Sequence, residues 1–196
     1  MLAELFGRIK GILISPAEEW KQIAREENEV VKLLLFWILP LAAITLIAFL
    51  IGPGLIHKFS HFGAGLALGL AFFVLYVAII FLAALIMNLL APSFGGKSEF
   101  GRALALAAYS FTPVFLIGIL YIIPFPNPNI MIFLTLAAFA YGLYIMFCGI
   151  GTMISVSKEI KLGFFITSAV IYAGLLCLSL FLLLEPVSIM FLKIFV

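Results

Sequence analysis

Charge is scarce in this sequence, and aspartate is missing altogether. Lys, Arg, Asp and Glu account for 10% of the 196 residues, whereas soluble domains carry about 25%. The shortage is concentrated: Lys58 is the only one of these residues between Leu33 and Gly96, and there is none between Ala103 and Ser157. Uncharged apolar runs of this length exclude a soluble globular domain and indicate an integral membrane protein.

Residues that commonly carry chemistry are also few. The two cysteines, Cys148 and Cys177, lie in apolar runs and are too few for a disulfide framework or a metal site. His57 and His61 are four residues apart, but no third ligand lies near them in the sequence. No ionisable residue falls deep inside an apolar run, where ion-coupled transporters and intramembrane hydrolases need one. We therefore predict no enzyme, no cofactor and no catalytic, cofactor-binding or metal-binding residue.

Five apolar runs are long enough to cross a bilayer, since a spanning helix needs about 20 residues. None shows the period-two alternation of a barrel strand, so each is expected to be a helix. The sequence predicts an all-α polytopic transmembrane bundle of five helices over residues 30–196, preceded by short amphipathic interfacial helices over residues 1–29. The predicted spans are residues 30–51, 66–90, 103–123, 130–154 and 162–184.

The C-terminal tail is expected to lie outside the fifth span. Glu185-Pro186 is predicted to end that span, because proline cannot donate a helical hydrogen bond. Val187–Val196 is too short to cross the bilayer again. We expect it to lie along the outer interface or to pack on the bundle.

Residues 1–29 carry two short amphipathic patterns. Apolar residues between Leu2 and Leu13 recur at helical spacing, which is typical of a helix lying in the membrane interface. Ser15-Pro16 then predicts the start of a second helix, with Glu18 completing a capping box. Trp20 is expected to anchor that helix at the interface. The region is either a collar that orients the first span or a docking surface for a cytosolic protein.

Lysine and arginine are distributed unevenly between the two sides of the predicted bundle. Nine lie in the N-terminal segment and in the loops after the second and fourth spans, and two, Lys58 and Lys193, lie on the opposite side. The positive-inside rule therefore predicts a cytoplasmic N-terminus and an external C-terminus. The expected location is the cell (cytoplasmic) membrane, with the lipid bilayer as partner and no nucleic acid partner.

The loop after the second span contains Gly95-Gly96-Lys97-Ser98, which looks like the end of a phosphate-binding loop. A Walker loop needs a further glycine five residues before Gly96, where this chain has Ala91, and it follows a buried strand rather than a membrane helix. We therefore predict a cytosolic turn and no nucleotide site. Gly95 and Gly96 let the chain turn, and Ser98 is expected to cap the next helix.

The cytosolic side offers a candidate interaction surface for anionic lipid headgroups or an acidic protein partner. The cations in it are equally consistent with a role in setting topology alone. The residues assigned to this surface are Trp20, Gly95, Gly96, Lys97, Phe100, Arg102, Lys158 and Lys161.

Two prolines, Pro40 and Pro113, interrupt the first and third spans at a similar depth, about 15 Å from the cytosolic side. The kinks are explained either by ordinary helix packing or by a hinge or shallow polar pocket of the kind carriers use. Ser110 and Thr112 are expected to satisfy the backbone groups freed by Pro113. The residues assigned to this hinge or pocket are Pro40, Thr45, Asn88, Tyr109, Ser110, Thr112 and Pro113.

Several stretches together resemble the Yip family (Ypt/Rab-GTPase-interacting) of membrane proteins, in its prokaryotic branch. They are Ile14-Ser15-Pro16 with Trp20, the loop Gly95–Phe100 running into Ala103–Pro113, Tyr141-Gly142-Leu143-Tyr144, Gly149, and Ser157–Lys161. The resemblance implies five spans and a cytosolic N-terminus. It also implies relatives that bind small GTPases and act in vesicle traffic and membrane shaping. This chain has a short N-terminal region and lacks their Asp-Leu-x-Gly-Pro element, so GTPase binding is not transferred to it.

The sequence thus predicts a non-enzymatic membrane organiser or adaptor that works through its cytosolic surface. The alternative is a passive permease or carrier for a small neutral or apolar molecule that uses the kinked helices. Gly65 and Gly69 form a GxxxG pattern, which fits close packing within the chain or a homo-oligomer.

Overall fold

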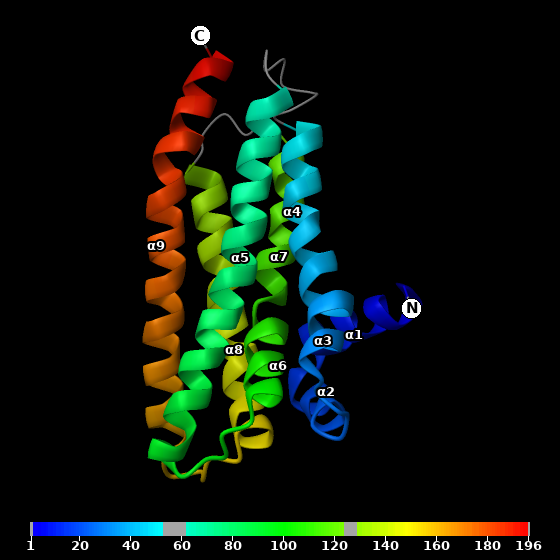
Figure 1. Ribbon diagram of the computed structural model, residues 1–196, viewed down its shortest axis with the longest axis vertical. Helices are drawn as coiled ribbons and strands as arrows, with labels where there is room; N and C mark the ends of the chain where they lie inside the picture. The colour runs from blue at the N-terminus through cyan, green and yellow to red at the C-terminus, as the bar shows by residue number, and fades with distance from the viewer. Residues whose placement is uncertain (1, 53–61, 124–128, 196) are drawn as a thin grey trace.

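The computed structural model describes residues 2–52, 62–123 and 129–195 of the chain. These residues form helices and the turns between them (Figure 1). In order the elements are α1 (Leu2–Ile14), α2 (Pro16–Ile23), α3 (Val30–Leu33), a π-helical turn (Leu34–Ile38), α4 (Leu39–Ile51), α5 (Phe62–Leu90), a 3₁₀ turn (Ala91–Phe94), α6 (Phe100–Ser110), α7 (Thr112–Ile117), a second 3₁₀ turn (Gly118–Ile122), α8 (Asn129–Met153) and α9 (Lys161–Phe195).

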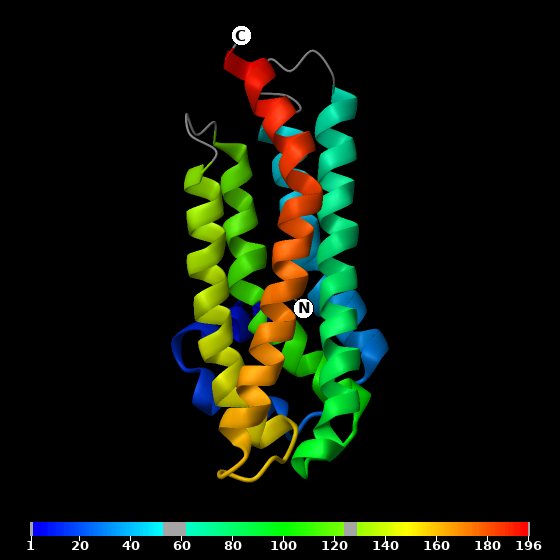
Figure 2. The ribbon, with the colours of Figure 1, turned by 90° about the vertical axis from the view of Figure 1, so that its left-hand side faces the viewer.

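The all-helical architecture is confirmed, with four candidate spans and a fifth if one bent helix pair is counted as a span. Four segments are long and apolar enough to cross a membrane alone: Val30–Ile51, Gly65–Phe94, Asn129–Met153 and Lys161–Ser179. The fifth candidate is the pair Phe100–Ser110 and Thr112–Ile122, which is bent by 40° at a short break. The long helices run side by side along the long axis of the molecule, and both views show the α5–α6 and α8–α9 connections at the same end (Figures 1 and 2).

The helix of the last span does not end at Glu185-Pro186, as the sequence predicted. α9 continues as one helix from Lys161 to Phe195. A proline removes only its own hydrogen bond to the residue four positions earlier, and the other backbone groups of a long helix remain paired. At 1.5 Å per residue a helix of this length, about 50 Å, exceeds the hydrocarbon core of a bilayer, which is about 30 Å thick.

Aromatic rings fill the bundle between α4, α5 and α7. The ring of Phe49 stacks on Phe72 at 5.0 Å and on Tyr121 at 4.4 Å between centroids. Tyr76 meets Phe111, at the break of the third span, edge to face at 5.3 Å. Offset and edge-to-face rings of this kind pack tightly and stabilise a core beyond their buried area.

Glycines let α8 approach its neighbours at backbone distance. A Cβ atom on Gly142 would collide with the carbonyl oxygen of Ser110, at the end of α6. A Cβ on Gly149 would come within 2.5 Å of the Trp20 indole ring. The two glycines are seven residues apart and so share one face of the helix. Gly69 of the GxxxG pattern likewise packs on Leu46 of α4. This glycine therefore serves helix packing within the chain, and a homo-oligomer is not needed to explain it.

We expect Gly149→Ala to destabilise the protein by about 1–3 kcal/mol, because the rigid indole of Trp20 must move to admit a methyl group. The matched control is Gly151→Ala, on the same helix, where an added Cβ meets nothing within 4 Å. That control is expected to be neutral or slightly stabilising, since alanine is the better helix former. Thermal unfolding in detergent measures both, and equal shifts in the two variants would contradict this packing.

Candidate interfacial site

Trp20, predicted to lie on the interaction surface, is instead buried inside the protein. Its side chain is 0% exposed, and its indole Nε1 donates a 2.9 Å hydrogen bond to the carbonyl oxygen of Ile145 on α8. The sequence pattern identified an apolar face on α2 correctly, but that face packs on α8 rather than on lipid. Ile12 on α1 and Ile23 on α2 are also fully buried.

Ionic contacts fix α1 against α2 and the turn after it. We call this unit, residues 2–29, the collar. The guanidinium of Arg8 donates to Glu19 at 2.8 Å and also binds Glu26. Burial opposes the charge on Arg8, but the hydrogen bond to Glu26 and the surrounding carboxylates outweigh it, so its pKa is raised. Arg8 therefore stays charged throughout the physiological pH range. The hydroxyl of Tyr141 on α8 adds a hydrogen bond to the Leu13 carbonyl.

The start of α2 differs in detail from the predicted capping box. Pro16 is the first helical residue and Ser15 precedes it, as expected, but the Ser15 side chain makes no capping hydrogen bond. The backbone carbonyl of Ser15 instead accepts from the amides of Glu18 and Glu19.

The glycine-rich loop after α5 joins the loop after α8. Gly95 has a left-handed φ of 66°, which favours glycine. The amide of Gly96 donates to Ala91 O at 2.9 Å, and the amide of Lys97 donates to Ile154 O at 3.0 Å. A Cβ on Gly96 would lie 2.8 Å from the Ile154 carbonyl oxygen. The two glycines therefore make a backbone junction between the loops.

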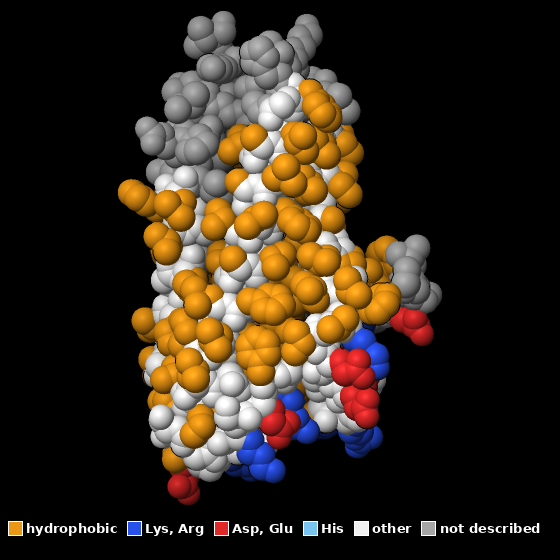
Figure 3. All heavy atoms as spheres, viewed as in Figure 1, with side chains coloured by type: hydrophobic (Ala, Val, Ile, Leu, Met, Phe, Trp, Pro, Cys, Tyr) orange, Lys and Arg blue, Asp and Glu red, His pale blue; other side chains and the backbone are white. Residues whose placement is uncertain are grey.

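The predicted surface cations differ in their availability. Lys97 and Lys158 are exposed, and neither forms an ion pair with another described residue. Arg102 binds Glu99 at 2.8 Å, and the ammonium of Lys161 lies 4.3 Å from the centre of the Phe147 ring. Phe100 is partly buried against the core. Charged side chains gather at this end of the visible face, whereas apolar side chains cover most of the remainder described (Figure 3).

Ser98 does not cap α6. The residue at the N-cap position is Glu99, whose side chain makes no capping bond. The Ser98 hydroxyl is hydrogen-bonded instead to Asn88 Oδ1, at 3.1 Å, near the end of α5. The assignment of Asn88 to an intramembrane pocket is therefore wrong, because its side chain is hydrogen-bonded to the loop after α5.

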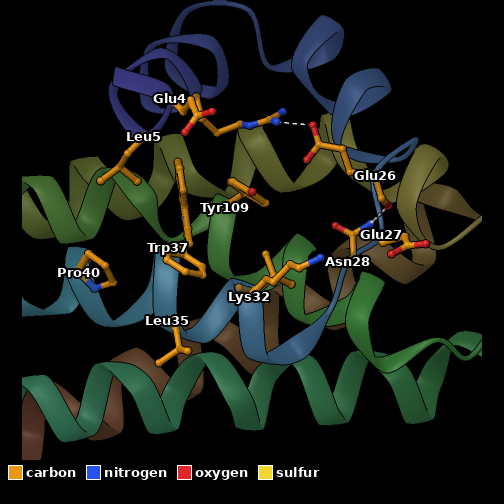
Figure 4. Close-up of a pocket in the computed structure, with 13 residues that line it drawn as sticks. Glu4, Leu5, Glu26, Glu27, Asn28, Lys32, Leu35, Trp37, Pro40 and Tyr109 are labelled. Carbon is orange, nitrogen blue, oxygen red and sulfur yellow. Dashed lines mark hydrogen bonds and ion pairs between the residues drawn. The ribbon is translucent and has the colours of Figure 1, made fainter. Parts of the chain in front are cut away.

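A cavity of about 680 Å³ lies between the collar and the start of the first span (Figure 4). Glu26, Glu27 and Asn28 lie at one end of it, and Leu5 and Pro40 lie toward the other. Tyr109 of α6 points into it between them. Its full lining is Glu4, Leu5, Arg8, Glu26, Glu27, Asn28, Lys32, Leu33, Leu35, Phe36, Trp37, Pro40 and Tyr109.

The structure does not bring the seven predicted hinge or pocket residues together. Pro40 and Tyr109 line the cavity, but the other five are not among its lining residues. The hydroxyls of Thr45, Ser110 and Thr112 are buried and have no hydrogen-bond partner among the described residues. The prediction that Ser110 and Thr112 satisfy the freed backbone is therefore wrong. The remaining two are Asn88, bound to Ser98, and Pro113, which is buried in the first turn of α7.

Each proline changes the helix geometry locally. Pro40 has no amide to offer the Phe36 carbonyl, and the turn before it widens so that the Leu39 amide donates to Leu34 O, five residues back. At Pro113 the helix breaks at Phe111, whose amide still donates to Ala107 O. The hydroxyl of Tyr172 on α9 donates to that same Ala107 carbonyl at 3.0 Å. The predicted kink in the third span is thus present.

The cavity was not predicted as a site, although parts of its pattern are visible in the sequence. Leu5 and Arg8 are three residues apart and so share a face of α1. The segment from Glu26 to Lys32 joins the collar to the first span, so its acidic residues must lie beside that face. What the sequence does not reveal is that Tyr109, from the third span, also lines the cavity. Among the described residues no group of His, Cys, Asp and Glu could hold a metal ion; His57 and His61 lie outside the described residues.

We expect Arg8→Ala to release α1 from the rest of the collar, because it removes both ionic contacts at once. Amide hydrogen exchange in α1 should become about fivefold faster, which corresponds to about 1 kcal/mol for a partly exposed ion pair. Lys10→Ala is the control, since its exposed side chain forms no ion pair with another described residue. Equal exchange in both variants would show that Arg8 does not hold α1.

Comparison with known proteins gives one family. The Yip1 domain model matches residues 10–181. The inner membrane protein YohC of Escherichia coli strain K12 is 27% identical over 186 residues, which cover 90% of this chain and 93% of the relative, and YohC of Escherichia coli O6:H1 strain CFT073 gives the same values. No solved structure matches the chain. Because the family match extends from α1 into α9 and includes the loops after α5 and α8, the chain belongs to the Yip1 domain family.

Proposed function

We propose that this protein is a non-enzymatic organiser of the cytoplasmic leaflet, located in the cytoplasmic membrane with its N-terminus in the cytosol. The location follows the name of its relative, an inner membrane protein. The orientation follows the excess of lysine and arginine at the end that carries the collar and the loops after α5 and α8.

The observation that carries the proposal is the position of α1. Its N-terminal end projects sideways from the bundle instead of running along it (Figure 1). Phe6 and Ile14 on it are 66% and 69% exposed. An amphipathic helix with exposed apolar residues lies about 5–10 Å deep at the boundary between headgroups and acyl chains. Because Arg8 and Trp20 hold the collar against the bundle, α1 acts as a fixed wedge in one leaflet.

The charged loops support the same role. Lys97 and Lys158 are exposed at the end of the bundle that also bears the collar. Each basic residue near an anionic surface contributes about 1 kcal/mol of attraction. Together with α1 they let the protein gather anionic lipid while it expands the leaflet. A cytosolic protein partner and self-association remain compatible with this surface.

The carrier alternative has less support from the geometry. Ser110 and Thr112 are buried hydroxyls at the break between α6 and α7, and Thr45 on α4 is buried as well, as a polar path would require. However, none of those hydroxyls lines the cavity. Phe49, Phe111 and Phe115, all at most 1% exposed, fill the neighbouring core. A path for a solute would therefore require helix movement.

The test uses the full chain in liposomes that contain anionic lipid. We expect the protein to reduce vesicle diameter and form tubules, as measured by electron cryomicroscopy, and the double variant Phe6→Ser, Ile14→Ser to lose most of this effect. The matched control is Phe133→Ser, Val170→Ser, which changes two equally exposed apolar residues on α8 and α9. Unchanged vesicle shape would overturn the proposal. Flux of a neutral solute such as glycerol, abolished by Pro113→Ala, would favour a carrier.

A further inference from the structure

We infer that the cavity beneath the collar is a binding site for an aminophospholipid from the surrounding leaflet, with its ammonium at Glu26 and Glu27 and its acyl chains toward Pro40. This inference does not depend on the organiser role, since α1 can act as a wedge whether or not the cavity is occupied. It rests on the charge, the openings and the unpartnered polar groups of the cavity.

The available charge in the cavity is negative. Its two cations are already paired: Arg8 with Glu19 and Glu26, and Lys32 with Glu29 at 2.9 Å. The carboxylate of Glu27 forms no ion pair or hydrogen bond with a described residue, and Glu26 lies beside it. A ligand with a positively charged, hydrogen-bonding end is therefore favoured over an anionic one. A primary ammonium supplies three donors for these carboxylates.

The opposite end of the cavity, where Figure 4 also shows Glu4 beside Leu5, has an apolar side that opens toward lipid. Leu35 and Phe36 are 50% and 54% exposed on the outer surface of the first span, and Pro40 next to them is also exposed. All three line the cavity. Figure 4 shows Pro40 and Leu35 on the side away from Glu26 and Glu27. A ligand that carries an ammonium at one end and alkyl chains at the other would thus enter sideways from the leaflet, without passing through the cytosol.

Two polar groups between these ends lack partners. The Tyr109 side chain is 7% exposed, and its hydroxyl has no hydrogen bond to another described residue. The Trp37 indole nitrogen is buried and also has no partner among the described residues. The Tyr109 hydroxyl, whose side chain points into the cavity, is therefore available to an acceptor supplied by a ligand. The phosphate and ester oxygens of a phospholipid are such acceptors.

The size of the cavity agrees with this class of ligand. At about 680 Å³ it falls in the range of sites that enclose a small molecule, roughly 300–1,000 Å³. It would hold a headgroup, the glycerol backbone and the first part of the chains, while the remaining chain length stays in the bilayer. A soluble hydrophobic cation also combines a positive charge with an apolar body. The test must therefore distinguish a membrane lipid from a soluble cation.

The test is a titration of the full chain in detergent, with binding of the first lipid followed by native mass spectrometry. Phosphatidylethanolamine, phosphatidylcholine and phosphatidylglycerol with identical dioleoyl chains are compared. We expect phosphatidylethanolamine to bind about tenfold more tightly than phosphatidylglycerol, as expected for one charge-assisted hydrogen bond. Phosphatidylcholine should bind more weakly than phosphatidylethanolamine, since its methylated nitrogen has no N–H to donate.

Glu27→Gln should remove the preference for phosphatidylethanolamine. The substitution should not destabilise the protein, because Glu27 is exposed and forms no ion pair with a described residue. Glu159→Gln, an exposed acid in the loop after α8, is the matched control and should keep the preference. Equal affinity for phosphatidylethanolamine and phosphatidylglycerol, or equal behaviour of the two variants, overturns the inference. So does displacement of the bound lipid by tetraphenylphosphonium at a tenfold lower concentration than the lipid itself, since the preferred occupant would then be a soluble cation.

Discussion

The insertion of Trp20 into α8 determines where the whole collar lies. Its indole is fully buried, its N–H is satisfied by Ile145 O, and Gly149 leaves the space that the ring occupies. An indole N–H buried without a partner would cost several kcal/mol. The ring therefore favours the one position along α8 where both the acceptor and the space are present. Once α2 is seated there, Arg8 fixes α1 through Glu19 and Glu26. The cavity exists because α1 is held across the first span rather than packed along it.

Close backbone contacts organise the rest of the bundle in a similar way. In a bilayer the hydrophobic effect does not favour contacts between helices over contacts with lipid. Helix association therefore depends on close packing by small residues and on hydrogen bonds. Gly142 admits the Ser110 carbonyl at the point where the third span breaks, and the Tyr172 hydroxyl binds the Ala107 carbonyl one turn earlier. These contacts hold the break between α6 and α7 in place. The aromatic core beside this break is filled. The described cavity lies elsewhere, between the collar and the start of the first span.

The sequence was sufficient for the fold but not for the site. The positions of the five spans follow from apolar length, and the kink in the third follows from Pro113, because both depend on local chemistry. The apolar face of α2 was also visible, but in a membrane protein such a face fits lipid and protein equally well, so the burial of Trp20 could not be read from it. The end of α9 was missed because one proline does not outweigh a long helix. Asn88 and Ser98 are ten residues apart across a turn, and only the turn geometry brings them together.

The charges at the predicted cytosolic end fall into two regions of opposite sign. The loops after α5 and α8 present Lys97 and Lys158, whereas the collar presents Glu26 and Glu27 beside a cavity that opens to lipid. If both faced bulk water, salt would screen them over about 8–10 Å and the separation would have little effect. If both meet headgroups in the interface, as we propose, the cationic loops would favour anionic lipids and the acidic cavity would favour lipids with an ammonium. On this proposal one rigid protein would hold two headgroup classes at fixed positions around a wedge.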